Sequence, residues 1–354
     1  ALVNFIAVRM FEPVIIPKLE LKDGVPEEFS TMVIVPTLLP NEKRVGELLK
    51  QLETNYLSNR GENIYFALVG DFKDSESEHL PEDDKIVNAA LDGIRKLNEK
   101  YARDQKDLFY FFHRSRQYSP AQGRWMGWER KRGAIIELND LLRGSENTSY
   151  SIISCDIDEI PYVKYVITID ADTIMPIDSA KRLIGTIMHP MNRAIIDREK
   201  GIVSEGYGLL QPRIDVSITS ANSTLFSKIF AGQGGIDPYT TAVSDVYQDI
   251  FGEGIFTGKG IYELDVFQEL LKDAIPENAV LSHDLLEGSY VRTGLVSDIF
   301  FVDGYPARYN SSSMRLHRWV RGDWQLMPWL GSKIRDRHGN WRKFPLSLIS
   351  RWKI

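Results

Sequence analysis

The chain has 354 residues, of which 43% are hydrophobic, so it can bury a substantial core, and we expect one large domain. Its formal net charge of -6 provides no global basic field, which argues against nucleic acid as a partner. The single cysteine, Cys155, excludes an internal disulfide framework and an all-cysteine metal site. No apolar run reaches the length of about 18 residues that a membrane-spanning helix needs.

Short β-branched runs alternate with stretches of helical periodicity in the first half of the chain, which favours a parallel sheet. The pattern predicts strands at residues 31–36, 64–69, 108–112 and 165–169, and helices at residues 45–56, 85–101 and 133–142. In open α/β sheets, ligands bind beyond the carboxyl ends of the strands. Because Asp71, Arg114 and Asp170 each follow a predicted strand, we expect them to converge on one site.

Asp170 and Asp172 form an Asp-x-Asp motif directly after a buried strand. Hard divalent cations take oxygen ligands and leave room for substrate phosphates, so one or two carboxylates suffice when a diphosphate completes the shell. We therefore expect the two carboxylates to bind Mg²⁺ or Mn²⁺. The alternative is an ordinary exposed loop, where the same tripeptide is common.

Beyond residue 201 the pattern loosens into strands and glycine-containing loops that match neither a phosphate loop nor a dinucleotide fingerprint. A second carboxylate candidate, Asp284, lies in this half, where a positioned carboxylate could take the proton from an attacking sugar hydroxyl. The alternative is that Ser282 or Asp284 only caps a helix. His283 could be a metal ligand, although a lone histidine there is more often a hydrogen-bonded structural residue.

Arginine and tryptophan are concentrated in residues 315–325. Arginine forks bind phosphate oxygens, and an indole face packs on a glucose ring. From residue 315 onward, ten Lys and Arg residues face only two Asp residues, and Trp residues lie among them. The same composition also suits a basic amphipathic helix at a membrane or partner surface.

Taken in order, these motifs resemble those of processive family 2 type glycosyltransferases such as cellulose and hyaluronan synthases. On the nucleotide side, Val33–Pro36 resembles the strand that contacts uracil, Asp71 a uridine-binding Asp, and Lys131–Gly133 a basic loop. Asp170–Asp172 resembles the metal motif, and Ile255–Lys259 an acceptor-side loop. Ser282–Asp284 resembles the catalytic-base motif, and Arg315–Trp319 the Gln-x-x-Arg-Trp motif. Two positions depart from that pattern, since His283 replaces Glu and Arg315 replaces Gln.

Longer strings look like the glycosyltransferase domain of cyclic β-1,2-glucan synthases. They occupy residues 125–133, 235–240, 243–248, 282–288 and 317–325. The resemblance implies a domain that uses UDP-glucose to extend a linear β-1,2-glucan at the cytoplasmic face of the bacterial inner membrane. It also implies a piece cut from a larger membrane protein, with flanking membrane helices and glucan-cyclising domains as partners.

The implied fold is an α/β fold of the glycosyltransferase A type, a mostly parallel central sheet flanked by helices, with a C-terminal amphipathic helical segment at the membrane interface. We expect an N-terminal extension at residues 1–30 and a catalytic domain at 31–310, divided into a nucleotide-binding half (31–175) and an acceptor half (176–310). An Arg/Trp-rich interfacial helical segment would follow at 311–354.

The resemblance assigns each candidate residue a role. The nucleotide-sugar contacts would be Pro36, Thr37, Asp71, Arg114, Lys131, Asp170, Arg318 and Arg321. The acceptor contacts would be Gly258, Lys259, His283, Trp319, Trp324 and Gln325. Asp170 and Asp172 would hold the metal, and Asp284 would be the base of an inverting single displacement.

Three other functions compete with this one. A catalytically silent module would bind a UDP-sugar without turnover. A glycoside hydrolase or phosphorylase would act on preformed glucan with a carboxyl pair and no nucleotide. A membrane-surface scaffold would use the basic, Trp-rich tail and would not bind UDP.

Overall fold

The computed structural model describes residues 10–12, 14–101, 106–231, 246–343 and 345–353. The chain divides into two compact units. The first unit is Leu21–Ala171, and the second combines Ala1–Glu20 with Asp172–Ile354. The boundary therefore falls inside the Asp-x-Asp motif, with Asp170 in the first unit and Asp172 in the second. The predicted domains at residues 1–30, 31–310 and 311–354 stay predictions.

The first unit is built on a sheet with the strand order β7-β1-β2-β3-β6. Strand β1 runs parallel to β2 and β7, β2 runs parallel to β3, and β6 is antiparallel to β3. Its helices are η1 (Glu27–Phe29), α2 (Glu42–Ser58), α3 (Asp83–Tyr101), α4 (Arg130–Leu141) and η2 (Ile157–Glu159), and its strands are β1 (Thr31–Leu38), β2 (Ile64–Asp71), β3 (Phe109–Arg114), β4 (Gln117–Ser119), β5 (Arg124–Met126), β6 (Tyr150–Ile153) and β7 (Tyr165–Thr168).

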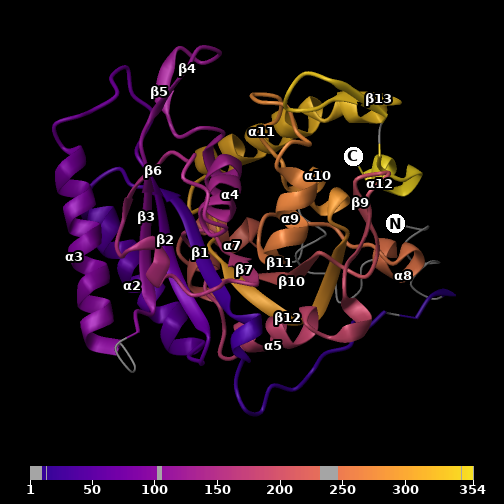
Figure 1. Ribbon diagram of the computed structural model, residues 1–354, viewed down its shortest axis with the longest axis horizontal. Coiled ribbons are helices and arrows are strands. Elements are labelled where there is room, and N and C mark those ends of the chain that lie inside the picture. The colour runs from indigo at the N-terminus through magenta and orange to yellow at the C-terminus, as the bar shows by residue number, and fades with distance from the viewer. Residues whose placement is uncertain (1–9, 13, 102–105, 232–245, 344, 354) are drawn as a thin grey trace. The chain divides into compact units, whose positions relative to one another are not determined.

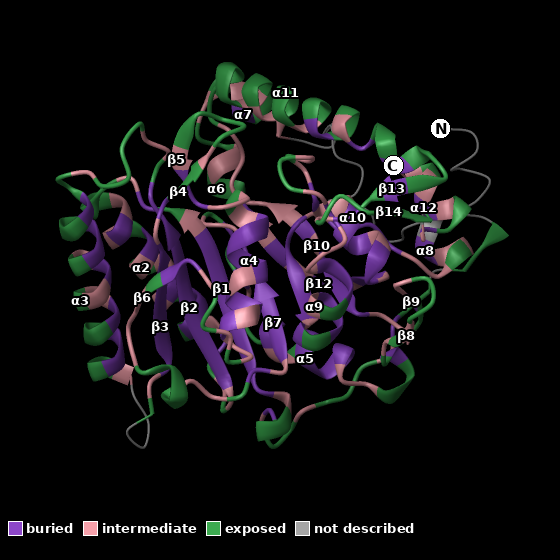
Figure 2. Ribbon diagram, turned by 45° about the horizontal axis from the view of Figure 1, so that its top comes forward, coloured by how far each residue is buried: buried purple, intermediate pink, exposed green. Residues whose placement is uncertain are grey.

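Strands β2 and β3 are buried along their whole length, in agreement with their continuous apolar sequences. Helices α2 and α3 cover one face of the sheet and α4 covers the other (Figure 1). Apolar residues of α2 at helical spacing, Val45, Leu48 and Leu52, form its buried side. The outer side of α3 is exposed, whereas the strands beside it are buried (Figure 2).

The carboxyl ends of β1, β2 and β3 lie at one edge of this sheet. Leu38 pairs with Asp71 across the β1–β2 ladder, and Gly70 pairs with His113 across the β2–β3 ladder. Pro36 lies in β1 beyond Ile34, the last residue of β1 that pairs with β7, so the missing proline N–H interrupts no bond to that strand. Polar residues at the three strand ends thus share one edge.

The second unit contains a three-stranded sheet with the order β12-β10-β11, in which β10 is parallel to β12 and antiparallel to β11. Helix α5 packs on all three strands, and α9 packs on β11. The helices are α5 (Ser179–Ile187), η3 (Pro190–Asn192), α6 (Ile218–Ala221), α7 (Leu225–Phe230), α8 (Val246–Phe251), α9 (Leu264–Leu271), α10 (Asp284–Tyr290), α11 (Tyr309–Gln325), η4 (Met327–Leu330) and α12 (Leu348–Lys353), and the strands are β8 (Ile195–Asp197), β9 (Ile202–Glu205), β10 (Leu209–Val216), β11 (Gly260–Glu263), β12 (Thr293–Asp303), β13 (Lys333–Arg335) and β14 (Trp341–Lys343).

The predicted α/β class, with a mostly parallel sheet flanked by helices, is confirmed. The C-terminal segment differs from the expectation, because it is not helical throughout. Helix α11 covers its first part and ends at Gln325, and Pro328 then prevents a regular continuation. A 3₁₀ turn, the β13–β14 hairpin and the short α12 follow. No helix within the described ranges is both long enough and apolar enough to cross a membrane.

Candidate functional site

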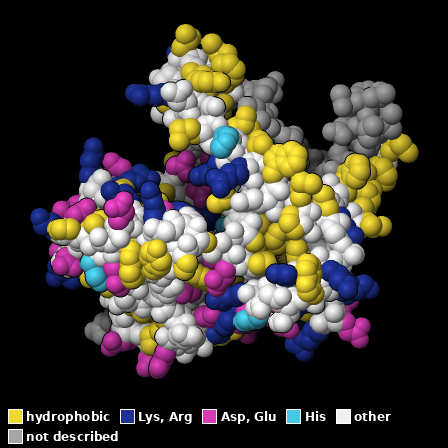
Figure 3. Space-filling model, turned by 90° about the horizontal axis from the view of Figure 1, so that it is seen from above, with side chains coloured by type: hydrophobic (Ala, Val, Ile, Leu, Met, Phe, Trp, Pro, Cys, Tyr) yellow, Lys and Arg dark blue, Asp and Glu magenta, His cyan; other side chains and the backbone are white. Residues whose placement is uncertain are grey.

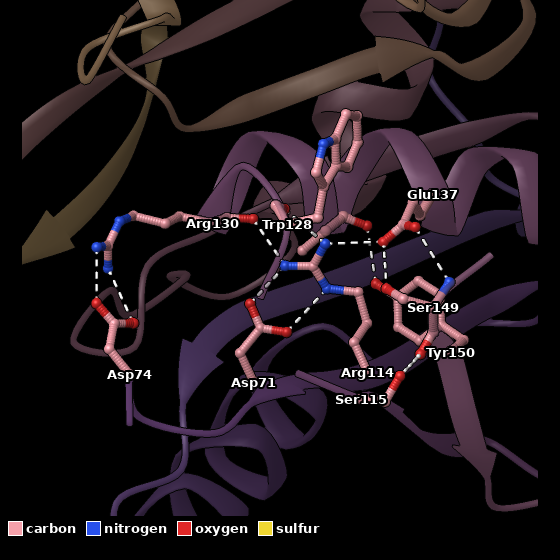
Figure 4. Close-up of polar contacts among 10 residues, drawn as sticks. Asp71, Asp74, Arg114, Ser115, Trp128, Arg130, Glu137, Ser149 and Tyr150 are labelled. Atoms are coloured by element: carbon pink, nitrogen blue, oxygen red, sulfur yellow. Dashed lines mark hydrogen bonds and ion pairs between the residues drawn. The ribbon is translucent and has the colours of Figure 1, made fainter. Parts of the chain in front are cut away.

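Arg114 ends strand β3 and is almost completely buried. Its Nε donates to Asp71 Oδ1 (2.8 Å) and its Nη2 to Asp71 Oδ2 (2.6 Å). Nη1 donates to Trp128 O and to Glu137 Oε2, both at 2.8 Å, and Nη2 also donates to Arg130 O (3.0 Å). These bonds, drawn in Figure 4, occupy all the N–H groups of the guanidinium. Arg114 is therefore engaged with protein groups in this structure, and its expected contact with the nucleotide sugar stays a prediction.

The Asp71–Arg114 pair is an internal ion pair at the end of two adjacent strands. Burial by itself lowers the pKa of Arg114, but the carboxylate of Asp71 outweighs it and raises that pKa above its ordinary value. Both Asp71 oxygens accept from the same guanidinium, an arrangement that fixes the plane of the carboxylate. Asp71 still has acceptor lone pairs beyond these two bonds.

The turn before α4 is held closely against this ion pair. A Cβ added to Gly127 would lie 2.5 Å from Asp71 Oδ2, so only glycine fits there. Glu129 and Arg130 both have left-handed backbone angles, with φ of 50° and 51°. Such angles cost non-glycine residues about 1 kcal/mol or more each. The carbonyl bonds that Arg114 donates to this turn offset that cost.

Lys131 lies in the first turn of α4, directly after the strained pair. Its Nζ donates to Asp170 Oδ1 at 2.6 Å. Asp170 itself follows β7, where the N–H of Ile169 bonds to Ile34 O and anchors the strand end to β1. The structure thus brings Lys131 and Asp170, two predicted nucleotide-sugar contacts, into direct contact with each other, while both side chains stay partly exposed to solvent.

Pro36 and Thr37, the remaining predicted nucleotide contacts of the first unit, lie at the end of β1. Pro36 is buried, and Thr37 is half-buried and pairs with Gly70 in the ladder, one residue before Asp71. Together with Asp71, they lie at the carboxyl-terminal edge of the sheet, the position expected for a ligand in such sheets, whereas Lys131 comes from α4.

Asp172 opens the second unit and is exposed. The next residues tie it to the end of β12. Thr173 Oγ1 donates to Asp303 Oδ1 at 2.6 Å, and Ile174 exchanges two backbone bonds with Val302. A Cβ added to Gly304 would lie 3.1 Å from Asp172 Oδ2, so this glycine gives the carboxylate its space.

Gly258 and Lys259 connect the Asp172 segment to Asp284. The buried Lys259 ammonium pairs with Asp303, the same residue that Thr173 contacts. A Cβ on Gly258, whose φ is +89°, would lie 2.8 Å from Asp284 Oδ1. The expected acceptor contact of Lys259 stays a prediction, and in this structure its ammonium pairs with Asp303.

Asp284 is the first residue of α10 and lies among other titratable groups. Neither Ser282 nor Asp284 is the cap residue, which is His283 without a capping side-chain bond, so the capping alternative is wrong. His283 Nδ1 lies 2.8 Å from Glu287 Oε1 and 3.6 Å from Asp284 Oδ1. One potential metal-ligand atom from each of the three side chains fits within 4.8 Å.

Helix α11 supports the loop that leads into Asp284. A Cβ on Gly322 would lie 2.6 Å from the Ser282 Cβ, and Gln325 Oε1 accepts from the Leu281 N–H at 2.8 Å. The amide oxygen of Gln325, a predicted acceptor contact, is therefore engaged with the backbone. Arg318 lies one turn before Gly322 on the same side of the helix.

The other predicted residues of α11 are more open. Arg318 and Arg321 are exposed, and no described residue forms a hydrogen bond or ion pair with either. Trp319 is half-buried and Arg315 lies over its ring at 4.4 Å, which covers one indole face. Trp324 is 68% exposed. These side chains can contact a ligand, but the structure ties none of them to the carboxylates.

Sequence reasoning missed three acidic residues in these clusters, Glu137, Asp303 and Glu287. Asp303 is the last residue of β12, just as Asp71 is the last residue of β2. The rule that ligands bind at the carboxyl ends of strands could therefore have identified Asp303. Glu137 and Glu287 lie inside helices and carry no such signal. The resembling strings at residues 235–240 and 243–245 lie outside the described residues.

No protein-family model matches the chain. Among curated proteins, it is 47% identical over 336 residues to "Cyclic beta-(1,2)-glucan synthase NdvB" of Rhizobium meliloti (strain 1021). That match covers 95% of this chain but only 12% of the relative.

Among solved structures, S. aureus TarS 1-349 matches at 11% identity with a TM-score of 0.39, covering 78% of this chain and 60% of the other. A longer S. aureus TarS structure matches at 13% identity with a TM-score of 0.35, covering 81% and 39%. Likeness at these TM-scores establishes neither fold nor activity. The resemblance to cyclic β-1,2-glucan synthases is confirmed by the sequence identity with the Rhizobium meliloti protein. The matched region includes nearly the whole chain and spans 12% of the length of that relative.

Proposed function

We propose that the chain is a glycosyltransferase domain that transfers glucose from UDP-glucose to a growing linear β-1,2-glucan. The similarity to a cyclic β-(1,2)-glucan synthase supports the substrate class. The observation that carries the reaction type is a set of contacts within the second unit. It starts at Thr173, the neighbour of Asp172, which bonds to Asp303, and Asp303 pairs with Lys259. Gly258, next to Lys259, lies against Asp284, so the segment of the proposed metal ligand is connected to the proposed base.

The Asp-x-Asp carboxylates suit a divalent cation. Asp170 is half-buried and Asp172 is exposed, and carboxylate oxygens are hard ligands that fit Mg²⁺ or Mn²⁺. When bound, such an ion would neutralise the diphosphate of the donor. Lys131, already beside Asp170, adds a positive charge that can bind the same phosphates. Arg318 and Arg321 are further phosphate candidates, and Trp319 and Trp324 are candidates for packing on sugar rings.

Asp284 is the proposed base. It would take the proton from the acceptor 2-hydroxyl as that oxygen attacks the anomeric carbon, opposite the departing UDP. The α-linked donor then becomes a β-linked product with one inversion. A side chain that is 28% exposed lets a hydroxyl reach the carboxylate, while Gly258 packs against it from the second unit's own loop.

The test compares UDP release from UDP-glucose in the wild-type protein, Asp284→Asn and Asp172→Ala, each with Mn²⁺ and with EDTA. We expect both variants and the EDTA-treated wild type to lose nearly all turnover. Asp178→Asn is the matched control, because Asp178 is exposed with φ of 60°, an angle that Asn tolerates well.

Undiminished turnover in Asp284→Asn would remove this residue as the base. Binding of UDP with Mn²⁺ but no turnover in the wild type would instead identify a silent nucleotide-sugar module. Activity on preformed glucan without UDP-glucose would identify a hydrolase or phosphorylase.

A further inference from the structure

We propose that four aromatic side chains, Phe226, Phe230, Tyr305 and Tyr309, form a shelf that binds sugar rings of the glucan acceptor beside Asp172. The inference rests on the proposed function, because the identity of the sugar comes from it. None of the four residues was among the candidates predicted from the sequence.

Both parts of this aromatic shelf follow two adjacent strand ends. Strands β10 and β12 run parallel, and Val216 at the end of β10 pairs with Asp303 at the end of β12. The chain continues from β10 into α6 and α7, and from β12 through Gly304 and Tyr305 to α11. Because ligands in α/β sheets bind beyond the carboxyl ends of strands, both segments lie where a substrate is expected.

Hydroxyl groups of α6 and α7 hold the loop that carries Tyr305. Ser220 Oγ accepts from the Tyr305 N–H at 3.0 Å, and Thr224 Oγ1 donates to Ala307 O at 2.8 Å. Thr224 is also the N-cap of α7, so one residue fixes both the helix start and the loop. In return, the Tyr305 hydroxyl donates to Phe230 O at 3.1 Å. The two segments are thus bonded to each other.

Phe226 connects the four rings. It stacks on Phe230 with ring centroids 4.9 Å apart and an interplanar angle of 30°, and the Tyr305 ring is inclined to it by 31°. Tyr309, the first residue of α11, meets Phe226 edge-on with centroids 6.1 Å apart. Helix α7 accordingly lies beside the start of α11 (Figure 2).

The aromatic shelf is open to solvent, unlike the aromatic cluster in the first unit. Phe230 is 53% exposed and Tyr309 is 68% exposed, whereas Tyr56 and Phe109, which are in contact in the first unit, are 2% and 0% exposed. Aromatic rings stabilise a fold mainly by being buried. Gathered rings that stay exposed therefore indicate a binding surface.

The composition of this surface favours an uncharged ligand that is rich in hydroxyl groups. Six of the eleven residues from 217 to 227 are Ser or Thr. Residues 217–231 and 304–309 contain no Asp or Glu, and their charged residues are Lys228 and Arg308. Sugars match these properties, because their C–H groups pack on aromatic faces and their hydroxyls bond to side-chain hydroxyls.

The position of the aromatic shelf identifies the sugar as the acceptor. A Cβ added to Gly304, the neighbour of Tyr305, would lie 3.1 Å from Asp172 Oδ2, so the shelf borders the proposed metal ligand. The exposed Leu225 and Ile229 of α7 would also suit a lipid surface. The border with Asp172 favours the acceptor, which must reach the donor sugar there.

The experiment measures the Kd of a linear β-1,2-glucan oligosaccharide for the UDP-bound protein by titration calorimetry. It also measures the KM of that glucan in UDP release from UDP-glucose. Phe230→Leu and Tyr309→Leu remove the flat rings but keep apolar side chains, whereas Phe230→Tyr and Tyr309→Phe keep the rings. Phe251→Leu is the matched control, since Phe251 is an exposed aromatic residue of another short helix in the same unit.

We expect Phe230→Leu and Tyr309→Leu each to raise the Kd and KM of the glucan about three- to tenfold, because each loses an aromatic contact with a sugar ring. Phe230→Tyr, Tyr309→Phe and Phe251→Leu should match the wild type. UDP affinity and the KM for UDP-glucose should not change in any variant, because the proposed nucleotide contacts are other residues. A role in folding alone would lower the amount of active protein and leave the Kd and KM of the glucan unchanged.

Unchanged glucan affinity in both leucine variants would overturn the inference. The double variant Leu225→Ser with Ile229→Ser tests the lipid alternative. If it loses binding to vesicles with anionic lipid while the leucine variants bind glucan normally, the surface is a lipid contact and the inference is wrong. No UDP release by the wild type, with glucan binding still dependent on the rings, would overturn the proposed function and retain the shelf as a sugar site.

Discussion

Arg114 shows how one buried side chain can organise several residues of the proposed site. Its guanidinium joins the Asp71 carboxylate to two carbonyls of the Trp128–Arg130 turn and to Glu137. The turn leads directly into Lys131, which contacts Asp170. Arg114 therefore positions two of the proposed nucleotide contacts, Asp71 and Lys131, from the interior of the first unit.

Arg114→Lys should weaken UDP binding in the presence of Mn²⁺ by about tenfold, because one ammonium cannot hold both Asp71 and the turn. It should also lower the free energy of unfolding by about 3 kcal/mol, the order expected when a buried pair is disrupted. Titration calorimetry and denaturant unfolding measure the two effects.

The matched control is Arg116→Lys. Arg116 is equally buried and holds Asp83 with two bonds, of 2.5 and 3.1 Å, but it anchors the loop after β2 and contacts no proposed site residue. We expect a comparable loss of stability with UDP affinity unchanged. Equal losses of affinity in both variants would show that Arg114 contributes only to stability.

His113, the neighbour of Arg114, gives a prediction about pH. Burial lowers its pKa to about 4, and neither ring nitrogen has a hydrogen-bond partner among the described residues. The unfolded chain binds a proton near pH 6.5, whereas the folded chain does so only near pH 4. Stability is therefore complete above pH 6.5 and is lost as the pH falls toward 4, by about 3 kcal/mol from this residue.

His113→Leu removes the titrating group at similar volume. Urea unfolding of both proteins between pH 7 and pH 4 should show that the wild type loses about 3 kcal/mol more than the variant. Parallel pH dependences in the two proteins would contradict the buried neutral state of His113.

At the scale of elements, the contact of α11 with the Ser282 loop can be tested at a glycine. The added Cβ in Gly322→Ala would meet the Ser282 Cβ at 2.6 Å, so the helix or the loop must move. We expect kcat for UDP release to fall while UDP binding persists, and stability to drop by about 1–3 kcal/mol. Enzyme kinetics and thermal unfolding measure both.

Gly46→Ala in α2 is the control for this substitution, because an added Cβ there meets nothing within 4 Å. It should raise stability by about 0.5–1 kcal/mol through helix propensity and leave kcat unchanged. If Gly322→Ala is as harmless as Gly46→Ala, α11 does not support the Asp284 loop.

The predicted strands and helices of the first half match the structure because their apolar runs are long and regular. Their ends differ by a few residues for local reasons. For example, α2 begins at Glu42 after the Asn41 cap, whereas the apolar pattern becomes visible only at Val45. The short β4–β5 and β8–β9 pairs were not predicted, since strands of three or four residues carry little periodic signal.

The candidate site was predictable only in part. Asp71 and Asp170 follow from the rule that ligands bind at strand ends. The roles of Arg114 and Lys259 were not predictable, because their partners come from distant parts of the chain, as with Lys259 and Asp303. Whether a charged side chain faces a ligand or another side chain depends on tertiary packing that a single sequence does not display.

Across the whole molecule, charge is unevenly distributed. The net charge is -6, yet the segment from residue 315 carries ten Lys and Arg against two Asp. Figure 3 looks onto the side where Figure 1 shows α11, and there hydrophobic side chains gather with Lys and Arg side chains among them. Exposed apolar side chains of α11 include Met314 and Trp324, on the same side of the helix as Arg321.

This composition predicts salt-dependent binding to anionic vesicles, in keeping with the proposed location at the inner face of a bacterial membrane. In a flotation assay, vesicles with anionic lipid should bind the protein at low salt, and binding should fall as ionic strength rises, because screening shortens the range of the attraction.

The double variant Met314→Ser with Trp324→Ser should bind more weakly, since it removes the apolar contacts. A matching pair in the first unit, Tyr118→Ser with Ile157→Ser, should change nothing, although both residues are exposed. Equal binding to neutral vesicles, or equal loss in both double variants, would show that α11 is not the membrane contact.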